Sequence, residues 1–203
     1  MGTSGGRLAN GVNAPARMVP APPPRLLRGR VLLLDDHENL CGGPDAPVAV
    51  SKAIWTALTQ ALSVDEYDNA IVGLSGFGAK NLMESLPMGQ LRLVLGRGPD
   101  GADNALIRAI DPDHVASRFD SVAIASGDHI FATLAWRLRD LGLMVCNVTA
   151  VTAGSSRALS MACTCRVRLK IDVRDRAVLS QLALVPAPIH GYEGEWIARH
   201  VKN

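Results

Sequence analysis

Five short apolar runs, each bounded by turn residues, dominate the hydrophobic pattern of this chain. Aliphatic side chains take consecutive positions in these runs instead of alternating with polar ones, which is typical of strands buried on both faces. The runs predict strands at residues 30–36, 69–75, 91–96, 121–126 and 143–148. A shorter strand is expected at residues 166–171, at an edge of the sheet.

Apolar residues at helical spacing fill the intervals between these strands. They predict helices at 50–62, at 104–110 with Asp103 as the N-cap, at 128–142 and at 155–165. Strands that alternate with helices form βαβ units, in which the strands are parallel and the helices cover both faces of the sheet. We therefore predict an α/β fold with a central, mostly parallel sheet.

Both ends of the chain depart from this pattern. Residues 1–28 are rich in Arg and Pro and contain no acidic residue, which predicts a disordered arm. Residues 174–203 show no comparable strand or helix pattern and predict a peripheral tail. One domain, at residues 29–173, is expected between them.

Composition narrows the class of protein. The chain is 48% hydrophobic with a net charge of +2, and no apolar run reaches the ~20 residues of a membrane helix. Its start lacks the apolar segment of a secretory signal. The four cysteines fit no common zinc spacing and predict buried free thiols in a reducing compartment. We expect a cytoplasmic protein that does not enter a membrane, and a homo-oligomer is left open.

Acidic residues recur where strands end. The stretch VLLLDDHENL (31–40) places Asp36 at the end of the first strand, while Asp103 follows the third strand and Asp128 the fourth. Parallel strands bring their carboxyl ends to one rim of the sheet, and three carboxylates there repel one another unless a cation compensates. Oxygen-rich clusters of this kind suit Mg²⁺ or Mn²⁺. The alternative is that Asp103 and Asp128 only cap helices.

Three segments together resemble the NYN domains, a branch of the PIN-like nucleases. They are LLLDDHENL (32–40), GADNALIRAI (101–110) and VAIASGDHIFATLAWRLRDLGLMVCNV (122–148). Members of that family share a hydrophobic strand ending in Asp-x-x-Asn, a helix start with Gly-Ala-Asp, and Ser-Gly-Asp before a helix that contains Phe. SSRALSMACTCRVRL (155–169) resembles the short helix and strand that follow in many bacterial members.

The resemblance implies a PIN-like three-layer sandwich and metal-dependent cleavage of RNA. It makes Asp36, Asp103 and Asp128 the catalytic, metal-binding acids, with Asn39 supporting the first loop and Ser126 orienting Asp128 or a phosphate. Many family members are also regarded as RNA-binding modules. This chain lacks two further acids that many members carry, because Ala109 and Ile130 occupy those positions.

Several cationic and titratable residues are candidates for contact with substrate. Arg97 has the guanidinium chemistry that suits a phosphate, although a plain surface role is the alternative. His37 and His129 flank the acids and are candidate proton shuttles, or else an exposed loop residue and a first-turn helix residue. The basic residues of 157–170 either contact an RNA backbone or form a solvated face.

We therefore expect a ribonuclease that binds Mg²⁺ or Mn²⁺ at Asp36, Asp103 and Asp128, with RNA as its partner. A non-catalytic RNA- or protein-binding module of the same fold is the main alternative, and the two missing acids favour it. A phosphohydrolase that uses Asp36 as nucleophile and Glu38 as the second acid is a further alternative.

Overall fold

The computed structural model describes residues 26–27, 29–63, 69–76, 79–87, 91–151 and 154–171. Most of the expected N-terminal arm and all of the expected C-terminal tail lie outside these residues. The described part contains no helix long and apolar enough to cross a membrane.

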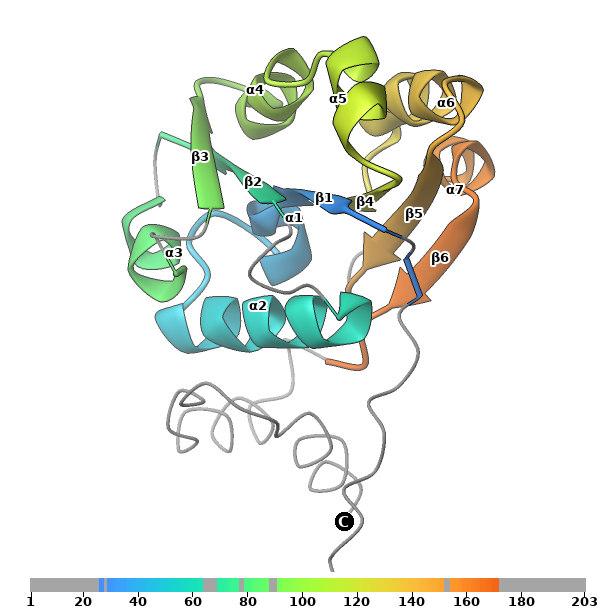
Figure 1. The fold of residues 1–203 in the computed structure, drawn as a ribbon. Coiled ribbons are helices and arrows are strands. Elements are labelled where there is room, and N and C mark those ends of the chain that lie inside the picture. Colours follow the sequence, from blue (N-terminus) through green and yellow to red (C-terminus); the bar gives the residue numbers. More distant parts are fainter. Residues whose placement is uncertain are drawn as a thin grey trace, which may run out of the picture.

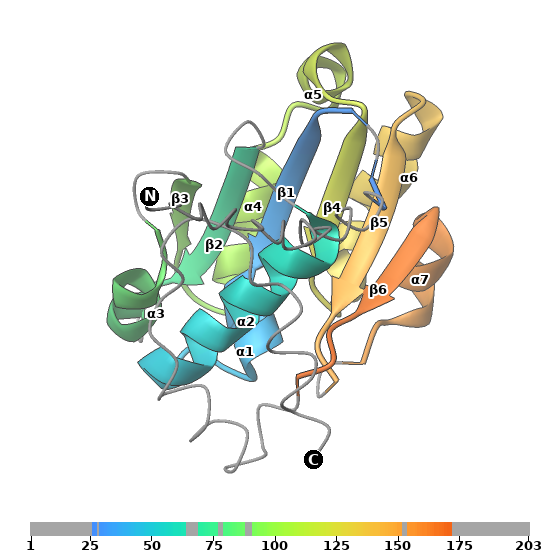
Figure 2. The same cartoon turned by 60° about the horizontal axis from the view of Figure 1, so that its bottom comes forward.

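A six-stranded sheet forms the centre of the fold, in the order β3-β2-β1-β4-β5-β6, and every neighbouring pair is parallel. Figure 2 shows the sheet behind α2 with this strand order. The predicted mostly parallel sheet is thus confirmed, and its strand bounds differ from the expected ones by a few residues at most. The strands are β1 (Val31–Asp36), β2 (Asn69–Ser75), β3 (Leu91–Gly96), β4 (Ser121–Ala125), β5 (Met144–Thr149) and β6 (Cys165–Arg168).

Helices cover both faces of this sheet, which makes a three-layer α/β arrangement (Figure 1). One face carries α1 (His37–Cys41), α2 (Val48–Leu62) and α3 (Ala79–Ser85). The other carries α4 (Gly101–Arg108), α5 (Pro112–Arg118), the 3-10 turn η1 (His129–Phe131), α6 (Ala132–Asp140) and α7 (Arg157–Ala162).

Two apolar cores lie on opposite sides of the sheet, and alternate side chains of β1 belong to one core or the other. Val31 and Leu33 belong to the core beneath α2, whereas Leu32 and Leu34 belong to the core beneath α4, α6 and α7. Successive side chains of a strand point to opposite faces. The same alternation, continued to the end of β1, separates the last two residues of the strand, Asp35 and Asp36.

Two helix starts differ from the expected ones. Helix α4 begins at Gly101, so Asp103 lies inside its first turn and is not the N-cap; Asp100 takes that place. The expected helix at 128–142 begins as η1, with Asp128 as the cap of that turn, and becomes α-helical only at Ala132.

The second half of the chain brings one further correction. The helix expected at 155–165 is confined to Arg157–Ala162, and Cys165 already belongs to β6. The expectation of free thiols is confirmed for all four cysteines, and of burial for three of them, since Cys165 is only half-buried.

Candidate functional site

The end of β1 sends two adjacent carboxylates to opposite sides of the sheet. Asp35 is fully buried and bonds to His37, whose ring nitrogen Nε2 reaches Ser51 on α2. Asp36 interacts instead with Asp103 on α4. Only Asp36 therefore contributes to a cluster at the α4 face, at the carboxyl end of the strand.

A glycine in the neighbouring strand lets α4 approach closely enough to bring Asp103 to Asp36. Gly73 of β2 pairs in register with Asp36. A Cβ atom at Gly73 would lie 2.6 Å from side-chain carbons of Leu106 and 3.0 Å from the carbonyl oxygen of Ala102. Leu106 and Ala102 occupy the space that a larger residue would fill, so α4 packs directly over Gly73, beside the end of β1.

Four carboxylates meet at this point. The carboxyl groups of Asp36 and Asp103 share a hydrogen bond. Carboxylate oxygens of Asp100, Asp103 and Asp128 all lie within 4.8 Å of one another. The structure thus brings the three predicted acids together around Asp103 and adds Asp100, which sequence reasoning missed. Its signal was present in GPDGAD, where two Asp three residues apart flank a helix start.

Asp100 is available for this cluster because its side chain does not cap the helix. Its backbone is left-handed, with φ of 50°, and its side chain makes no capping hydrogen bond. The backbone carbonyl of Asp100 accepts from the backbone and the side chain of Asn104 instead. The exposed carboxylate is therefore left to face Asp103 and Asp128.

Burial and mutual repulsion make ionisation of the cluster costly. Desolvation, followed by the charge and the hydrogen bond of Asp103, raises the pKa of Asp36 to about 8. Burial also raises the pKa of Asp103, and the charges of Asp128, Asp100 and Glu38 act in the same direction. In the absence of a cation, and below this raised pKa, Asp36 keeps a proton that it can donate toward Asp103.

The loops that carry these acids are tied together by Ser126 and Asn39. The hydroxyl of Ser126 donates to Asp36 Oδ2 at 2.8 Å and accepts from the backbone N–H of Asp128 at 3.1 Å. The Asn39 side chain accepts from the Gly127 N–H at 2.9 Å. These bonds join the end of β1 to the end of β4, so Asp36 and Asp128 are held in one frame. Ser126 thus contacts both acids.

The buried side-chain amide of Asn147 holds the loop that carries Ser126 and Asp128. Asn147 of β5 is 1% exposed and donates to the carbonyl oxygen of Ser126 at 2.8 Å. Its own carbonyl accepts from the Ser155 hydroxyl at 2.6 Å. A Cβ atom at Gly127 would lie 2.3 Å from the Gly154 carbonyl oxygen, so this loop fits only without a side chain.

Two of the predicted substrate-binding residues, His129 and Arg97, are exposed at the carboxyl end of the sheet. His129 is 81% exposed, and its Nδ1 lies 2.8 Å from Asp128 Oδ1. Arg97 is exposed directly after β3, at the same end of the sheet. Glu38 is half-buried and accepts from the backbone N–H of Ser75. The expected contacts of His129 and Arg97 with substrate stay predictions, as does the role of Glu38 as the second acid of a phosphohydrolase.

Both sequence interpretations of His37 were wrong. The imidazole is fully buried on the α2 side, where Nδ1 lies 2.8 Å from Asp35 Oδ2 and Nε2 lies 2.7 Å from Ser51 Oγ. Burial lowers its pKa, but the Asp35 carboxylate outweighs this effect and raises the pKa to about 10. The hydroxyl of Ser51 is in turn hydrogen-bonded to the hydroxyl of Ser85 on α3. His37 is thus a structural residue that ties β1 to α2 and α3.

Fold and site together define a parallel α/β protein with an acidic cluster at the carboxyl ends of its strands. No protein-family model matches this chain, and no curated protein does. One solved structure with a similar shape is a protein of unknown function from Vibrio parahaemolyticus, with 16% sequence identity and a TM-score of 0.47. The match covers 71% of this chain and 94% of that one. The resemblance to NYN domains therefore stays a prediction.

The residues of the cluster fit a hard divalent cation. All donors are carboxylate oxygens, the ligands that Mg²⁺ and Mn²⁺ prefer. Asp103 Oδ1 is buried and accepts no hydrogen bond from an N–H or hydroxyl group among the described residues. A buried oxygen without a donor is costly, and a cation would satisfy it.

Proposed function

We propose that this protein is a metal-dependent ribonuclease that hydrolyses phosphodiester bonds at the carboxyl end of its sheet. The observation that carries the proposal is the convergence of Asp36, Asp100, Asp103 and Asp128, with one buried oxygen of Asp103 lacking a donor. A cluster of carboxylates at the end of a parallel sheet, in which the pKa values of Asp36 and Asp103 are raised, is a candidate catalytic site on physical grounds.

Asp103 is the central ligand in this proposal, because it contacts acids on both sides. Asp100 and Asp128 supply further oxygens, and Asp36 joins them once it loses the proton that it shares with Asp103. A bound Mg²⁺ or Mn²⁺ would polarise the phosphoryl group and lower the pKa of a water molecule. Ser126 holds Asp36 and the Asp128 backbone, and Asn39 holds Gly127. These bonds fix the ligands before substrate arrives.

Two exposed residues are proposed to contact the RNA. Arg97 can bind a phosphate through two parallel hydrogen bonds, which suits its guanidinium group. His129 lies at the open side of Asp128, where its ring can donate to a phosphate oxygen or move a proton. Arg97→Ala is expected to raise KM with little change in kcat, whereas His129→Ala is expected to lower kcat.

The test is cleavage of a labelled single-stranded RNA in Mn²⁺ by the wild type, by Asp103→Asn and by Asp113→Asn. Asp113 is a matched control because its exposed carboxylate pairs with Arg137, away from the cluster. We expect Asp103→Asn to lose nearly all turnover, because a bound metal supplies several kcal/mol of transition-state stabilisation. Cleavage that survives in chelator, or in Asp103→Asn, would refute the proposal.

A non-catalytic RNA-binding module is the second candidate, and the hydrogen bonds of the acids favour it. Both oxygens of Asp36 accept hydrogen bonds, from Ser126 and from the backbone of Asn39. Asp128 Oδ1 accepts from the Ile130 N–H at 3.0 Å. Several carboxylate oxygens of the cluster thus already accept hydrogen bonds from the protein and do not require a cation. Tight RNA binding by the wild type without cleavage in Mn²⁺ or Mg²⁺ would select this candidate.

A further inference from the structure

One face of the molecule, formed by α6, α7 and β6, carries an excess of positive charge. Between Ala132 and Ile171 the sequence contains a single acidic residue, Asp140, against six basic ones. The basic residues are Arg137, Arg139, Arg157, Arg166, Arg168 and Lys170. Arg137 is paired with Asp113 of α5 at 2.9 Å, so its charge is already compensated within the protein.

Strand alternation directs two of these arginines to the same side of the sheet as α6 and α7. Cys165 and Val167 of β6 pack against the core beneath α2. Arg166 and Arg168, which alternate with them, therefore point to the opposite face, and both are exposed. The Arg168 guanidinium donates to the carbonyl oxygen of Val151 at 3.0 Å, so it is held in place while exposed.

Trp136 gives this face an aromatic surface. Its side chain is 46% exposed on α6, and the guanidinium of Arg139 lies 4.7 Å from the centre of its ring system. Arg139 also donates to the carbonyl oxygens of Met161 and Ala162, at 3.2 Å each. Met161 itself is 61% exposed. Arg139 thus fixes the tryptophan of α6 beside the end of α7.

Arg139 of α6 and Arg166 of β6 both lie near Cys163. Burial and the nearby Cys165 raise the pKa of the Cys163 thiol to about 12, while Arg139 and Arg166 oppose this rise. Both guanidinium groups therefore lie close enough to act on the same thiol. Arg139 thus links the exposed Trp136 to the end of α7, where Met161 is exposed.

This surface reaches the carboxylate cluster through the start of α7. The backbone N–H of Ser156, the N-cap of α7, donates to the carbonyl oxygen of Gly127 at 2.9 Å. Arg157 follows and is exposed. Gly127 directly precedes Asp128, so the cationic face begins at the edge of the acidic site and runs away from it along α7 and β6.

We propose that the surface formed by Trp136, Arg139, Arg157, Met161, Arg166 and Arg168 binds single-stranded nucleic acid and leads it to the carboxylate cluster. Arginines that outnumber the single acidic residue of this segment, Asp140, match the charge of a phosphate backbone. The exposed Trp136, with Arg139 over one face of its ring, offers an aromatic surface on which an unpaired base can stack. The inference shares its partner with the proposed function, but it rests on other residues and requires no turnover.

The test measures binding of a fluorescein-labelled 15-nucleotide oligouridine by anisotropy, in chelator, so that cleavage cannot contribute. Trp136→Leu is expected to weaken binding roughly 5- to 100-fold, whereas Trp136→Phe, which keeps a ring, should bind within a few-fold of the wild type. Removing Arg166 and Arg168 together should reduce the slope of log K against log salt by about 0.7 per lost phosphate contact.

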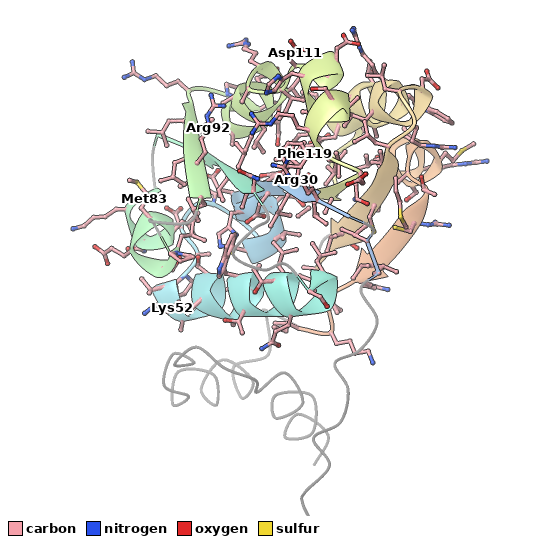
Figure 3. The ribbon with its side chains drawn as sticks, in the orientation of Figure 1. Arg30, Lys52, Met83, Arg92, Asp111 and Phe119 are labelled. Atoms are coloured by element: carbon pink, nitrogen blue, oxygen red, sulfur yellow. The ribbon has the colours of Figure 1, made fainter. Side chains whose placement is uncertain are left out.

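Arg92→Ala and Lys52→Ala are the matched controls. Both residues are exposed cations, and Figure 3 shows them on β3 and α2, away from α7 and β6. Neither substitution should change the affinity or the salt slope. Equal weakening by Arg92→Ala and by the Arg166 and Arg168 variant would mean charge attraction without a defined surface, and it would overturn the inference.

Further arms separate this inference from its rivals and from the proposed function. A DNA oligonucleotide of the same length tests whether the 2′-hydroxyl contributes. Vesicles rich in phosphatidylserine test a membrane as partner, and Trp136-dependent binding to vesicles but not to RNA would refute the inference. Wild-type binding that Trp136→Leu weakens, without cleavage in Mn²⁺, would uphold this surface and reject the ribonuclease. Cleavage of RNA by the wild type, with binding that none of the surface variants changes, would uphold the ribonuclease and reject this surface.

Discussion

Replacement of Asp36 by Asn should change how the stability of the metal-free protein depends on pH. Burial and Asp103 raise the pKa of Asp36 from 3.8 to about 8 in the folded state. Between these values the folded protein keeps a proton that the unfolded chain has released. Stability is therefore highest at low pH and is lost as the pH rises through this window.

The size of the loss follows from the two pKa values. A difference of about four units corresponds to about 6 kcal/mol at 1.36 kcal/mol per unit, which is an upper limit. Relaxation and water entry around a buried charge lower such penalties, and we expect about 2–3 kcal/mol for the wild type between pH 5 and pH 8. In Asp36→Asn this contribution disappears, because the amide cannot ionise and can still donate toward Asp103.

Urea unfolding in chelator at pH 5, 6, 7 and 8 measures the effect. His37, whose pKa is raised to about 10, also stabilises the fold below pH 6.5 and loses this contribution as the pH rises toward 10. Because it does so in both proteins, the quantity to compare is the difference between wild type and Asp36→Asn. Asp113→Asn, at an exposed site, should parallel the wild type. Parallel curves for the wild type and Asp36→Asn would refute the reasoning.

Three other outcomes are expected. His37→Ala leaves Asp35 buried without its partner and should cost about 3–5 kcal/mol in urea unfolding, whereas Ser85→Ala, at the far end of the same hydrogen-bond chain, should cost about 1 kcal/mol. Gly127→Ala drives a Cβ atom toward the Gly154 carbonyl and should destabilise by about 1–3 kcal/mol, while Gly154→Ala, whose Cβ meets no atom within 4 Å, should be nearly neutral. Saturating Mn²⁺ should raise the Tm of the wild type by several degrees but leave that of Asp103→Asn unchanged; an equal rise in both would exclude Asp103 as a ligand.

Four strands, β1, β2, β4 and β5, could be predicted closely from the sequence because they are buried on both faces. An uninterrupted apolar run such as VLLL in VLLLDD is typical of such a strand, and turn residues mark its ends. The run at 91–96 also forms a strand, but the expectation that it is buried on both faces was wrong, because β3 lies at an edge of the sheet and none of its residues is fully buried. Short helices carry a weaker signal, and α1, α3 and α5 were missed. For α5 the signal was present, since Asp111 caps the helix and Pro112 opens it.

The candidate site was only partly predictable, because its composition depends on packing between distant segments. The pattern placed Asp36, Asp103 and Asp128 at strand ends, and parallel topology brings strand ends together. Strand alternation could have shown that Asp35 and Asp36 point to opposite faces, but nothing in the pattern indicated that His37 turns to the side of Asp35. Asp100 joins the cluster only because a left-handed turn frees its carboxylate, a feature for which an isolated Asp-Gly pair is weak evidence.

The central claim is that Asp103 and its neighbours hold a divalent cation, and anomalous diffraction from crystals grown with Mn²⁺ tests it most directly. We predict one anomalous peak at about 2.2 Å from an oxygen of Asp103, with oxygens of Asp100 or Asp128 and water completing the coordination. The peak should be absent from crystals of Asp103→Asn under the same conditions. Fully occupied Mn²⁺ elsewhere, with none at Asp103 and with the protonated Asp36 carboxyl still directed at the Asp103 carboxylate, would contradict the account.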